Sequence, residues 1–309
     1  MGCCPTIGPK SSAETKQLKA LDSAPLLISS HPEMVKIPSG DWQIGHEGPE
    51  AIHTDGEGPK RVVSSSAFLI DRTAVTNDEF AEFIAATGHV TEAEQTGWSF
   101  VFYAQINPSA LQFIKPIEIS IERWWKAVEG ATWSTPDGPY SSLENKGAHP
   151  VVHVSWSDAI AFSMWARKRL PTEVEWEIAA RGGLKGALYP WGNVLTPNNN
   201  HRCNIWQGVF PFENTAEDGF LGTAPANSYP PNSFGLFNMV GNTWEWCVDT
   251  WCPDQSQLKA MRGGSYLCHR SYCNRYRVSA RTANTADATS SHLGFRCAAD
   301  LIMDTKIDE

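Results

Sequence analysis

The stretch Arg262–Arg277, which reads RGGSYLCHRSYCNRYR, is the most informative part of this chain. Two cysteines in it, Cys268 and Cys273, lie five positions apart among basic and aromatic residues. Two thiolates on one short segment can bind a soft metal ion such as Cu(I), whereas zinc would need further ligands from elsewhere. Basic neighbours stabilise thiolates, so the pair could also be nucleophilic or redox-active. A local disulfide and two unreactive thiols are the other interpretations, and the spacing alone does not decide among them.

The composition indicates a compact globule that is rich in loops. The chain has 309 residues, of which 41% are hydrophobic, with 24 glycines, 20 prolines and 13 tryptophans. This length can bury a large core, and the abundance of turn-forming residues favours a loop-rich α+β fold over a helical bundle. The net charge of −9 argues against a nucleic-acid partner.

The N-terminus gives a weaker indication of compartment. It begins MGCCPTIGPK and lacks the charged and apolar regions of a secretory signal, and no apolar run in the chain is long enough to cross a bilayer. We therefore expect a cytoplasmic protein with no membrane partner. Gly2 and Thr6 do fit the M-G-x-x-x-[ST] lipidation consensus beside Cys3 and Cys4, but we favour a chance match in a disordered tail.

The remaining sequence predicts one domain. We expect residues 1–32 to be the tail and residues 33–305 to form a single domain, with a monomer as the default state. Capping boxes at Thr76 and Thr172 predict helices that end at glycines, and SDAIAFSMWARKR predicts another helix. Short strands are expected at MVKI, WQIG, FLIDRTAV, VVHVSW, RGGSYL and LGFRCAAD, whereas residues 91–150 and 184–250 are expected to be mostly irregular.

Taken with ARTANT and LGFRCAAD, the cysteine-containing stretch closely resembles the signature of the formylglycine-generating enzymes, the sulfatase-modifying oxidases. The resemblance covers roughly residues 33 to 300 and includes DGEGPKRVV, FLIDRTAVTNDEF, GWSFVF, HPVVHVSW, KRLPTEVEWEIAARGG, YPWGN, NIWQG, EDGF and GNTWEW, in that order. GNTWEW alone would indicate only the wider superfamily, whereas the paired cysteines are specific to the catalytic branch. The resemblance implies a loop-rich variant of the C-type-lectin-like fold.

The resemblance also implies a reaction and a set of residues. The family oxidises the cysteine of a Cys-x-Pro-x-Arg motif in an unfolded sulfatase to Cα-formylglycine, using dioxygen, a thiol reductant and a copper ion. By this analogy Cys268 and Cys273 are catalytic and hold Cu(I), and the substrate thiolate joins them as a third sulfur ligand. Ser265 matches the serine of the family's GGSxxC motif, and Trp244 matches a tryptophan near the oxygen pocket. Core packing is the alternative role for Trp244.

Two oxygen-rich loops are candidates for calcium binding. Alone, NIWQGVFPFENTAEDGF and NMVGNTWEW would more often be turns held by side-chain hydrogen bonds, and neither is an EF-hand loop. The resemblance favours two structural calcium sites. The first would use the side chains of Asn204 and Asp218 with the carbonyls of Ile205 and Phe220, and the second the side chains of Asn238 and Glu245 with the carbonyls of Gly241 and Thr243.

The sequence departs from the animal members at their core disulfides. Ser163 and Val278 stand where cysteines would be expected, and Cys297 lacks its partner. This agrees with a reducing compartment and a bacterial-type enzyme. Cys247 and Cys252 could form a local disulfide, although free thiols are the default. The family's asparagine before LGFRC is His292 here, which leaves one pocket contact open.

Three classes of function are compatible with these sequence features. The copper oxidase is the leading hypothesis. A non-catalytic peptide- or ligand-binding paralogue would have no need of both Cys268 and Cys273. A non-heme iron sulfoxide synthase on the same fold would need a histidine-rich iron site, and nothing in the sequence resembles its paired-histidine motif.

Overall fold

The computed structural model describes residue 5, residues 34–117 and residues 123–301. Its centre is a four-stranded sheet in the order β11-β10-β9-β12. Strand β9 (Trp244–Thr250) pairs antiparallel with β10 (Leu258–Arg262), which pairs antiparallel with β11 (Arg281–Thr285). The two-residue strand β12 (Leu293–Gly294) runs parallel to β9. This sheet carries the chain into and out of the cysteine-containing stretch.

Four smaller sheets surround the centre. A three-stranded sheet has the order β1-β4-β13, and the others are the pairs β2-β3, β5-β6 and β7-β8. Their bounds are β1 Met34–Ile37, β2 Gly40–Ile44, β3 Arg61–Ser65, β4 Phe68–Asp71, β5 Trp98–Phe102, β6 Trp125–Glu129, β7 Gly208–Val209, β8 Glu213–Asn214 and β13 Ala298–Asp300.

The helices begin where the sequence provides caps. Helix α1 (Asn77–Thr87) and helix α4 (Glu173–Arg181) both open with a complete capping box and end at a glycine in the left-handed conformation, as predicted. Helix α3 (Trp156–Trp165) has a capping box at Ser155, and the short helix α2 (Glu92–Thr96) has one at Thr91. Each box satisfies backbone donors that would otherwise lack partners at the helix start.

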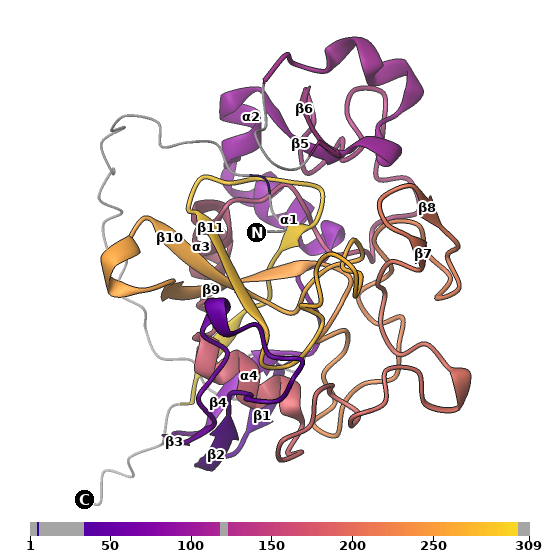
Figure 1. Ribbon diagram of the computed structural model, residues 1–309. Helices are drawn as coiled ribbons and strands as arrows, with labels where there is room; N and C mark the ends of the chain where they lie inside the picture. Colours follow the sequence, from indigo (N-terminus) through magenta and orange to yellow (C-terminus); the bar gives the residue numbers. More distant parts are fainter. Residues whose placement is uncertain (1–4, 6–33, 118–122, 302–309) are drawn as a thin grey trace, which may run out of the picture.

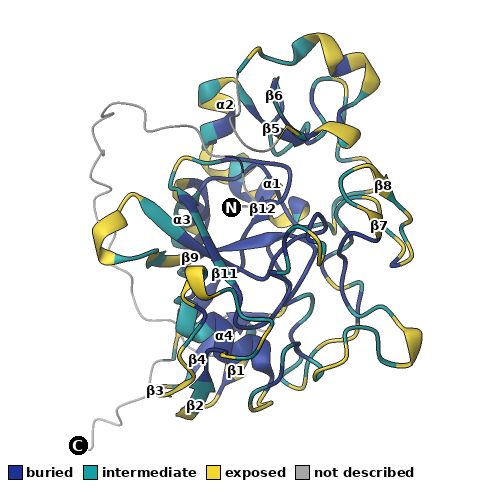
Figure 2. Cartoon of the chain, in the orientation of Figure 1, coloured by how far each residue is buried: buried dark blue, intermediate teal, exposed yellow. Residues whose placement is uncertain are grey.

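Figure 1 shows how these elements are arranged. Helix α2 and the β5-β6 pair lie together at the top of the view, while the β7-β8 hairpin and long loops lie at the right. Helix α4 lies below the central sheet, near β1 and β4. Buried residues concentrate around β9 and β12, and exposed residues lie on the outer turns (Figure 2). Trp176, Trp244 and Trp246 are among the largest fully buried side chains and fill this centre.

Three expectations about strands need correction. Residues 151–155 are buried but form no strand, because His153 has a left-handed φ of 60° and interrupts the extended run. Residues 244–250 were expected to be irregular but form β9, which is paired on both sides. RGGSYL is not a strand, since β10 ends at Arg262 and two left-handed glycines follow it.

Other expectations were too coarse. Residues 91–150 contain α2, β5 and β6, with Trp98 and Trp125 each opening a strand. Most of the expected tail lies outside the described residues. Pro5 is the exception, because it is buried and its carbonyl accepts a hydrogen bond of 3.0 Å from the Asn284 side chain. Within the described ranges, no helix has the length and apolar character needed to span a membrane.

Candidate active site

Two glycines direct the chain from β10 into the cysteine turn. Gly263 and Gly264 have φ values of 95° and 75°, a region that other residues rarely adopt. A Cβ atom on Gly264 would lie 2.8 Å from the carbonyl oxygen of Arg275, so there is no space for a side chain. Glycine at this position therefore allows the two ends of the turn to pack against each other.

The turn brings the two predicted copper ligands together. The sulfur atoms of Cys268 and Cys273 lie 3.0 Å apart, which is too far for the bond of about 2.0 Å in a disulfide. Both residues are buried, with 1% and 0% exposure. Hydrogen bonds from Cys268 N to the Ser265 carbonyl (2.9 Å) and from Cys273 N to the His269 carbonyl (2.7 Å) fix the backbone. The two sulfur atoms are therefore held side by side on one turn.

The surroundings of the sulfur atoms favour negative charge. The Nη1 atom of Arg275 lies 3.8 Å from the sulfur of Cys273, and the backbone N–H of Ser265 donates to the sulfur of Cys268 at 3.3 Å. Asp55 accepts a 2.6 Å hydrogen bond from Arg275 Nε and holds this guanidinium in place. A cation and an N–H donor both stabilise a thiolate, the form that binds a soft metal ion.

The other two predicted site residues lie beside this pair. The Ser265 hydroxyl lies 3.2 Å from Nδ1 of His292, and the His292 carbonyl accepts a 2.9 Å hydrogen bond from the backbone of Trp244. Trp244 is fully buried, and its indole Nε1 has no hydrogen-bond partner within the described part of the chain. The structure therefore links all four predicted catalytic residues through short contacts, and it places His292 among them.

Aromatic side chains surround the turn. Tyr272 stacks on Phe210 with ring centroids 4.7 Å apart, and it meets Trp124 edge-to-face at 4.8 Å. Trp125 meets the His292 ring edge-to-face at 4.6 Å. Such pairs favour one ring orientation over others and help to order the loops that carry them.

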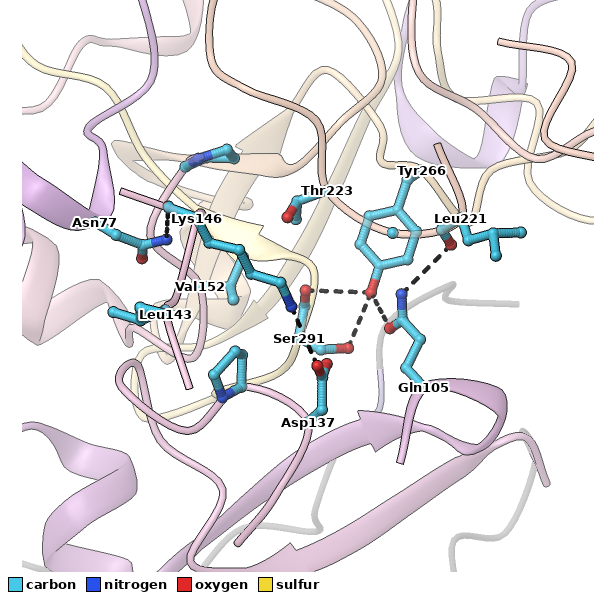
Figure 3. A pocket seen from close by; sticks show the side chains of 13 residues that line it. Asn77, Gln105, Asp137, Leu143, Lys146, Val152, Leu221, Thr223, Tyr266 and Ser291 are labelled. Atoms are coloured by element: carbon cyan, nitrogen blue, oxygen red, sulfur yellow. Dashed lines mark hydrogen bonds and ion pairs between the residues drawn. The ribbon is translucent and has the colours of Figure 1, made fainter. Parts of the chain in front are cut away.

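A cavity of about 210 Å³, lined by both polar and apolar residues, lies on one side of the site (Figure 3). Tyr266, two residues before Cys268, points its hydroxyl toward this cavity, where it contacts Gln105 at 2.6 Å and Ser291 at 3.1 Å. Lys146 and Asp137 form an ion pair of 3.2 Å on the cavity wall. The cavity therefore lies next to the turn that holds the two cysteines.

The residues of the first predicted calcium site are close together. The carboxylate of Asp218 accepts hydrogen bonds from the backbone of Ile205 at 2.9 Å and of Phe220 at 3.1 Å. Gln207 donates to both the Ile205 carbonyl and Asp218. The side-chain oxygen of Asn204 is buried without a hydrogen-bond donor among the described residues. Burial raises the pKa of Asp218, against the lowering effect of these hydrogen bonds. A hard cation would satisfy both the amide oxygen and the carboxylate.

The second predicted site fits less well. The side-chain oxygen of Asn238 is also buried without a donor in the described ranges, as a ligand oxygen would be. The carboxylate of Glu245, however, already forms a buried ion pair with Arg296 at 2.7 Å and accepts a 2.7 Å hydrogen bond from Trp176. The two predicted sites adjoin each other, because a Cβ atom on Gly241 would lie 2.4 Å from the Asn204 carbonyl oxygen.

The other four cysteines in the described part of the chain are free thiols. Cys203, Cys247, Cys252 and Cys297 form no disulfide with any described residue, so the local bridge between Cys247 and Cys252 is absent. Burial raises the pKa of the Cys203, Cys247 and Cys297 thiols. These three are therefore kept protonated and unreactive.

Comparisons with known proteins show the family of the chain. The family described as "Sulfatase-modifying factor enzyme 1-like domain" matches residues 21–301. A formylglycine-generating enzyme of Thermomonospora curvata is 54% identical over 284 residues, which cover 86% of this chain and 93% of that protein. The chain belongs to the formylglycine-generating enzyme family.

Two further comparisons place the chain within this family and fold. A mouse protein named inactive Cα-formylglycine-generating enzyme 2 is 45% identical over 282 residues, covering 89% of each chain. PvdO from Pseudomonas aeruginosa superposes with a TM-score of 0.63 at 22% identity, covering 91% of this chain and 96% of that one. The loop-rich α+β fold predicted from the resemblance to the formylglycine-generating enzymes is confirmed.

Several residues that support the site were not identified from the sequence. Arg275 was noted only as a basic neighbour, and its partner Asp55 lies 220 positions away in the sequence. Asn242 accepts from Asn204 at 3.1 Å and from the Ala224 backbone at 2.8 Å, which ties the two oxygen-rich loops together. The acidic residues of DGEG, Asp55 and Glu57, could have been recognised as partners for arginines. Nothing in the sequence showed which arginines they would contact.

Proposed function

We propose that this chain oxidises the cysteine of a Cys-x-Pro-x-Arg motif in unfolded sulfatases to Cα-formylglycine, using dioxygen and Cu(I). The observation that carries the proposal is the pair of buried cysteine sulfur atoms, 3.0 Å apart, on one turn of a chain from this family. Two convergent sulfur atoms are a donor set suited to a soft monovalent ion. Cys268 and Cys273 would hold the copper ion, which supplies the one-electron chemistry with dioxygen that side chains lack.

The chain's own residues prepare this site. Ser265 N–H and Arg275 stabilise negative charge on the two sulfur atoms, and Asp55 orients the guanidinium. Burial of both cysteines keeps water away and strengthens these electrostatic interactions. The indole N–H of Trp244, which has no acceptor among the described residues, is a donor that could orient a polar group of a ligand.

The overall reaction requires a reductant. Converting a CH2–SH group to an aldehyde with release of hydrogen sulfide removes two electrons from the peptide. Dioxygen accepts four electrons when both of its oxygen atoms are fully reduced, so two more electrons and two protons come from two thiol molecules, which leave as one disulfide. One peptide, one dioxygen and two thiols thus give one aldehyde, one hydrogen sulfide, one water and one disulfide.

Calcium would have a structural role at the Asn204–Asp218 loops. The buried amide oxygens of Asn204 and Asn238 and the carboxylate of Asp218 support this assignment. The first site is the stronger candidate, because Glu245 of the second site is already paired with Arg296. We further propose a single cytoplasmic domain that acts as a monomer on its peptide substrate.

The two rival functions receive less support. The mouse relative named inactive shows that the family includes non-catalytic members, but a binding module does not need a pair of buried thiols. An iron site would need several histidines or carboxylates together, and no group of three or more His, Cys, Asp and Glu side chains suited to a metal lies within the described residues.

A peptide assay tests the proposed function. The Cu(I)-loaded protein is incubated with a Cys-x-Pro-x-Arg peptide, air and dithiothreitol, and mass spectrometry detects the aldehyde and its hydrazide adduct. We expect conversion by the wild type and by Cys247→Ser, a matched change at a buried thiol outside the turn, and none by Cys268→Ser. Binding of copper and peptide without conversion by the wild type would refute the proposal for this substrate motif.

A further inference from the structure

A second cavity, of about 430 Å³, lies on another side of the cysteine turn. Its volume falls within the range of small-molecule sites, about 300 to 1,000 Å³. Apolar and aromatic groups form part of its wall, and charged and imidazole side chains form the rest. The lining residues used below are Arg202, Cys203, Trp206, His269, Arg270 and Tyr276.

The cavity shares its wall with the catalytic turn. His269 lies between the two cysteines in the sequence, and its carbonyl accepts the N–H of Cys273 at 2.7 Å. The backbone N–H of Trp206 donates to the carbonyl of Cys268 at 3.1 Å. Burial, followed by charge on neighbours that include Cys268 and Cys273, raises the pKa of Tyr276. A molecule bound here would therefore lie against the backbone that positions both sulfur atoms.

The charge of the cavity is opposite to that of the whole chain. Arg202 and Arg270 are cationic, and Glu217 is the one acidic side chain in the lining. Glu217 is 65% exposed and approaches His201 only to 4.0 Å, so it remains at the rim. The positive charge of the lining therefore comes from the two arginines. On a chain with a net charge of −9, such a pocket attracts anions locally.

Arg202 has a donor to offer such a ligand. Its guanidinium lies over the ring of Trp191, 5.7 Å from the centroid, which fixes the side chain along the wall. Its Nε is buried and has no hydrogen-bond acceptor within the described part of the chain. A buried donor of this kind is costly unless a ligand or water accepts from it, and a carboxylate is the strongest common acceptor for a guanidinium.

We propose that this cavity binds the reductant of the reaction, a small thiol that carries a carboxylate, with Arg202 and Arg270 as its anchors. The inference rests on the proposed function, which consumes two thiols per turnover. These two thiols give two electrons and two protons to dioxygen and leave as one disulfide. Glutathione, with two carboxylates and one ammonium group, belongs to this chemical class. Arg202 and Arg270 select the reductant by its negative charge, and the peptide substrate binds elsewhere on the protein.

Binding is tested first without turnover. S-methylglutathione, which has the charges of glutathione but no free thiol, is titrated calorimetrically into the wild type, Arg202→Gln, Arg270→Glu and the control Arg61→Glu. Arg61 is exposed on β3 and does not line this cavity. We expect each cavity variant to bind about tenfold more weakly, a loss of about 1.4 kcal/mol, because it lacks one charged anchor for the ligand. The proposal would be overturned if Arg270→Glu bound S-methylglutathione as tightly as the wild type does, or if the wild type did not bind it at millimolar concentration.

Kinetics then separate the reductant from the peptide. In the cavity variants the KM for glutathione should rise about tenfold, whereas the KM for uncharged dithiothreitol and the KM for the peptide stay as in the wild type. Equal changes for both thiols would contradict charge selection. Arg270 is exposed, so Arg270→Glu remains informative even if Arg202→Gln fails to fold. Because the calorimetry needs no catalysis, a chain that binds S-methylglutathione but oxidises no peptide would refute the proposed function and leave the binding site standing.

Discussion

The guanidinium of Arg275 contacts the sulfur of Cys273 through Nη1 at 3.8 Å. Nε of the same guanidinium donates a 2.6 Å hydrogen bond to the Asp55 carboxylate, which keeps the positive charge beside the sulfur. The cysteine pair is thus embedded in an electrostatic environment that segments from both ends of the domain create.

Removing this charge should weaken copper binding. We expect Arg275→Gln to lower the affinity for Cu(I) by roughly tenfold, because the thiolate loses its nearby cation, and Arg275→Lys to lower it less. Competition with a chromogenic Cu(I) chelator measures the affinity without catalysis. Arg61→Gln serves as the distant control. Equal affinity of wild type and Arg275→Gln would show that the guanidinium does not act on the sulfur.

The buried pair formed by Glu57 and Arg277 should stabilise the same region. Both side chains are fully buried, and Arg277 Nη2 donates to Glu57 at 2.5 Å. We expect Glu57→Gln to lower the free energy of unfolding by about 3 to 5 kcal/mol, because it leaves a buried arginine without its counter-charge. Urea denaturation measures the loss, and Glu82→Gln on the exposed face of α1 should change it little. A loss below 1 kcal/mol would contradict this account.

The same pair predicts a loss of stability in acid. Burial alone would raise the pKa of Glu57, but the hydrogen bond and charge of Arg277 outweigh it and hold this pKa below its ordinary value of 4.5. An acid with a depressed folded pKa contributes stability above its unfolded pKa and loses it as pH falls through the folded value. The contribution of Glu57 should therefore disappear below about pH 4.5, and Glu57→Gln should unfold with a shallower pH dependence there.

His153 should produce a second pH effect at a higher range. Its Nε2 donates to the Pro136 carbonyl at 2.8 Å, and its Nδ1 lies 2.7 Å from the Ser99 hydroxyl. Burial lowers the pKa of His153 to about 4. A base with a depressed folded pKa gives full stability above its unfolded pKa of about 6.5 and loses it as pH falls toward 4.

The size of that effect is measurable. The shift corresponds to about 3 kcal/mol of unfolding free energy lost between pH 6.5 and pH 4. His153→Gln should be less stable than wild type at pH 7 but should show a flatter pH dependence in this range. His53→Gln, at an exposed position, should keep the wild-type slope. Parallel curves for His153→Gln and wild type would rule out a buried neutral histidine.

Calcium should stabilise the chain through Asp218. Burial raises the pKa of this carboxyl, so its ionised form is costly until a cation binds. At a calcium concentration of 100 times Kd, we expect about 3 kcal/mol of added stability, seen as a higher Tm in differential scanning calorimetry. The gain should shrink as pH falls and Asp218 takes up a proton, and Asp218→Asn should remove most of it. A Tm in Asp218→Asn that rises with calcium as in wild type would place the site elsewhere.

The sequence predicted best those features that depend on neighbours in the chain. The boxes at Thr76 and Thr172 formed as expected, because each uses side chains only three positions apart. Strand β9 was missed because its stability comes from β10 and β12, which flank it only in the folded chain. Turn-forming residues before Trp244 obscured it further.

The same distinction holds for the site. The sequence identified the sulfur pair, Ser265 and Trp244 because they lie in or match recognisable segments. It could not show that Asp55 would orient Arg275, or that the side-chain oxygen of Glu245 would already be paired with Arg296, because those contacts connect distant segments. Nor could it show the second cavity, whose wall is drawn from two loops that meet only on folding.

The most direct test of the central claim follows oxygen and product in one reaction. Cu(I)-loaded protein, a Cys-x-Pro-x-Arg peptide and dithiothreitol are mixed in a sealed cell, with oxygen uptake read by an electrode and aldehyde by mass spectrometry. We expect the wild type to consume one dioxygen per aldehyde formed, and we expect neither oxygen uptake nor aldehyde from Cys273→Ala that still binds the peptide. Oxygen uptake without aldehyde, or aldehyde formation that persists in Cys273→Ala, would contradict it.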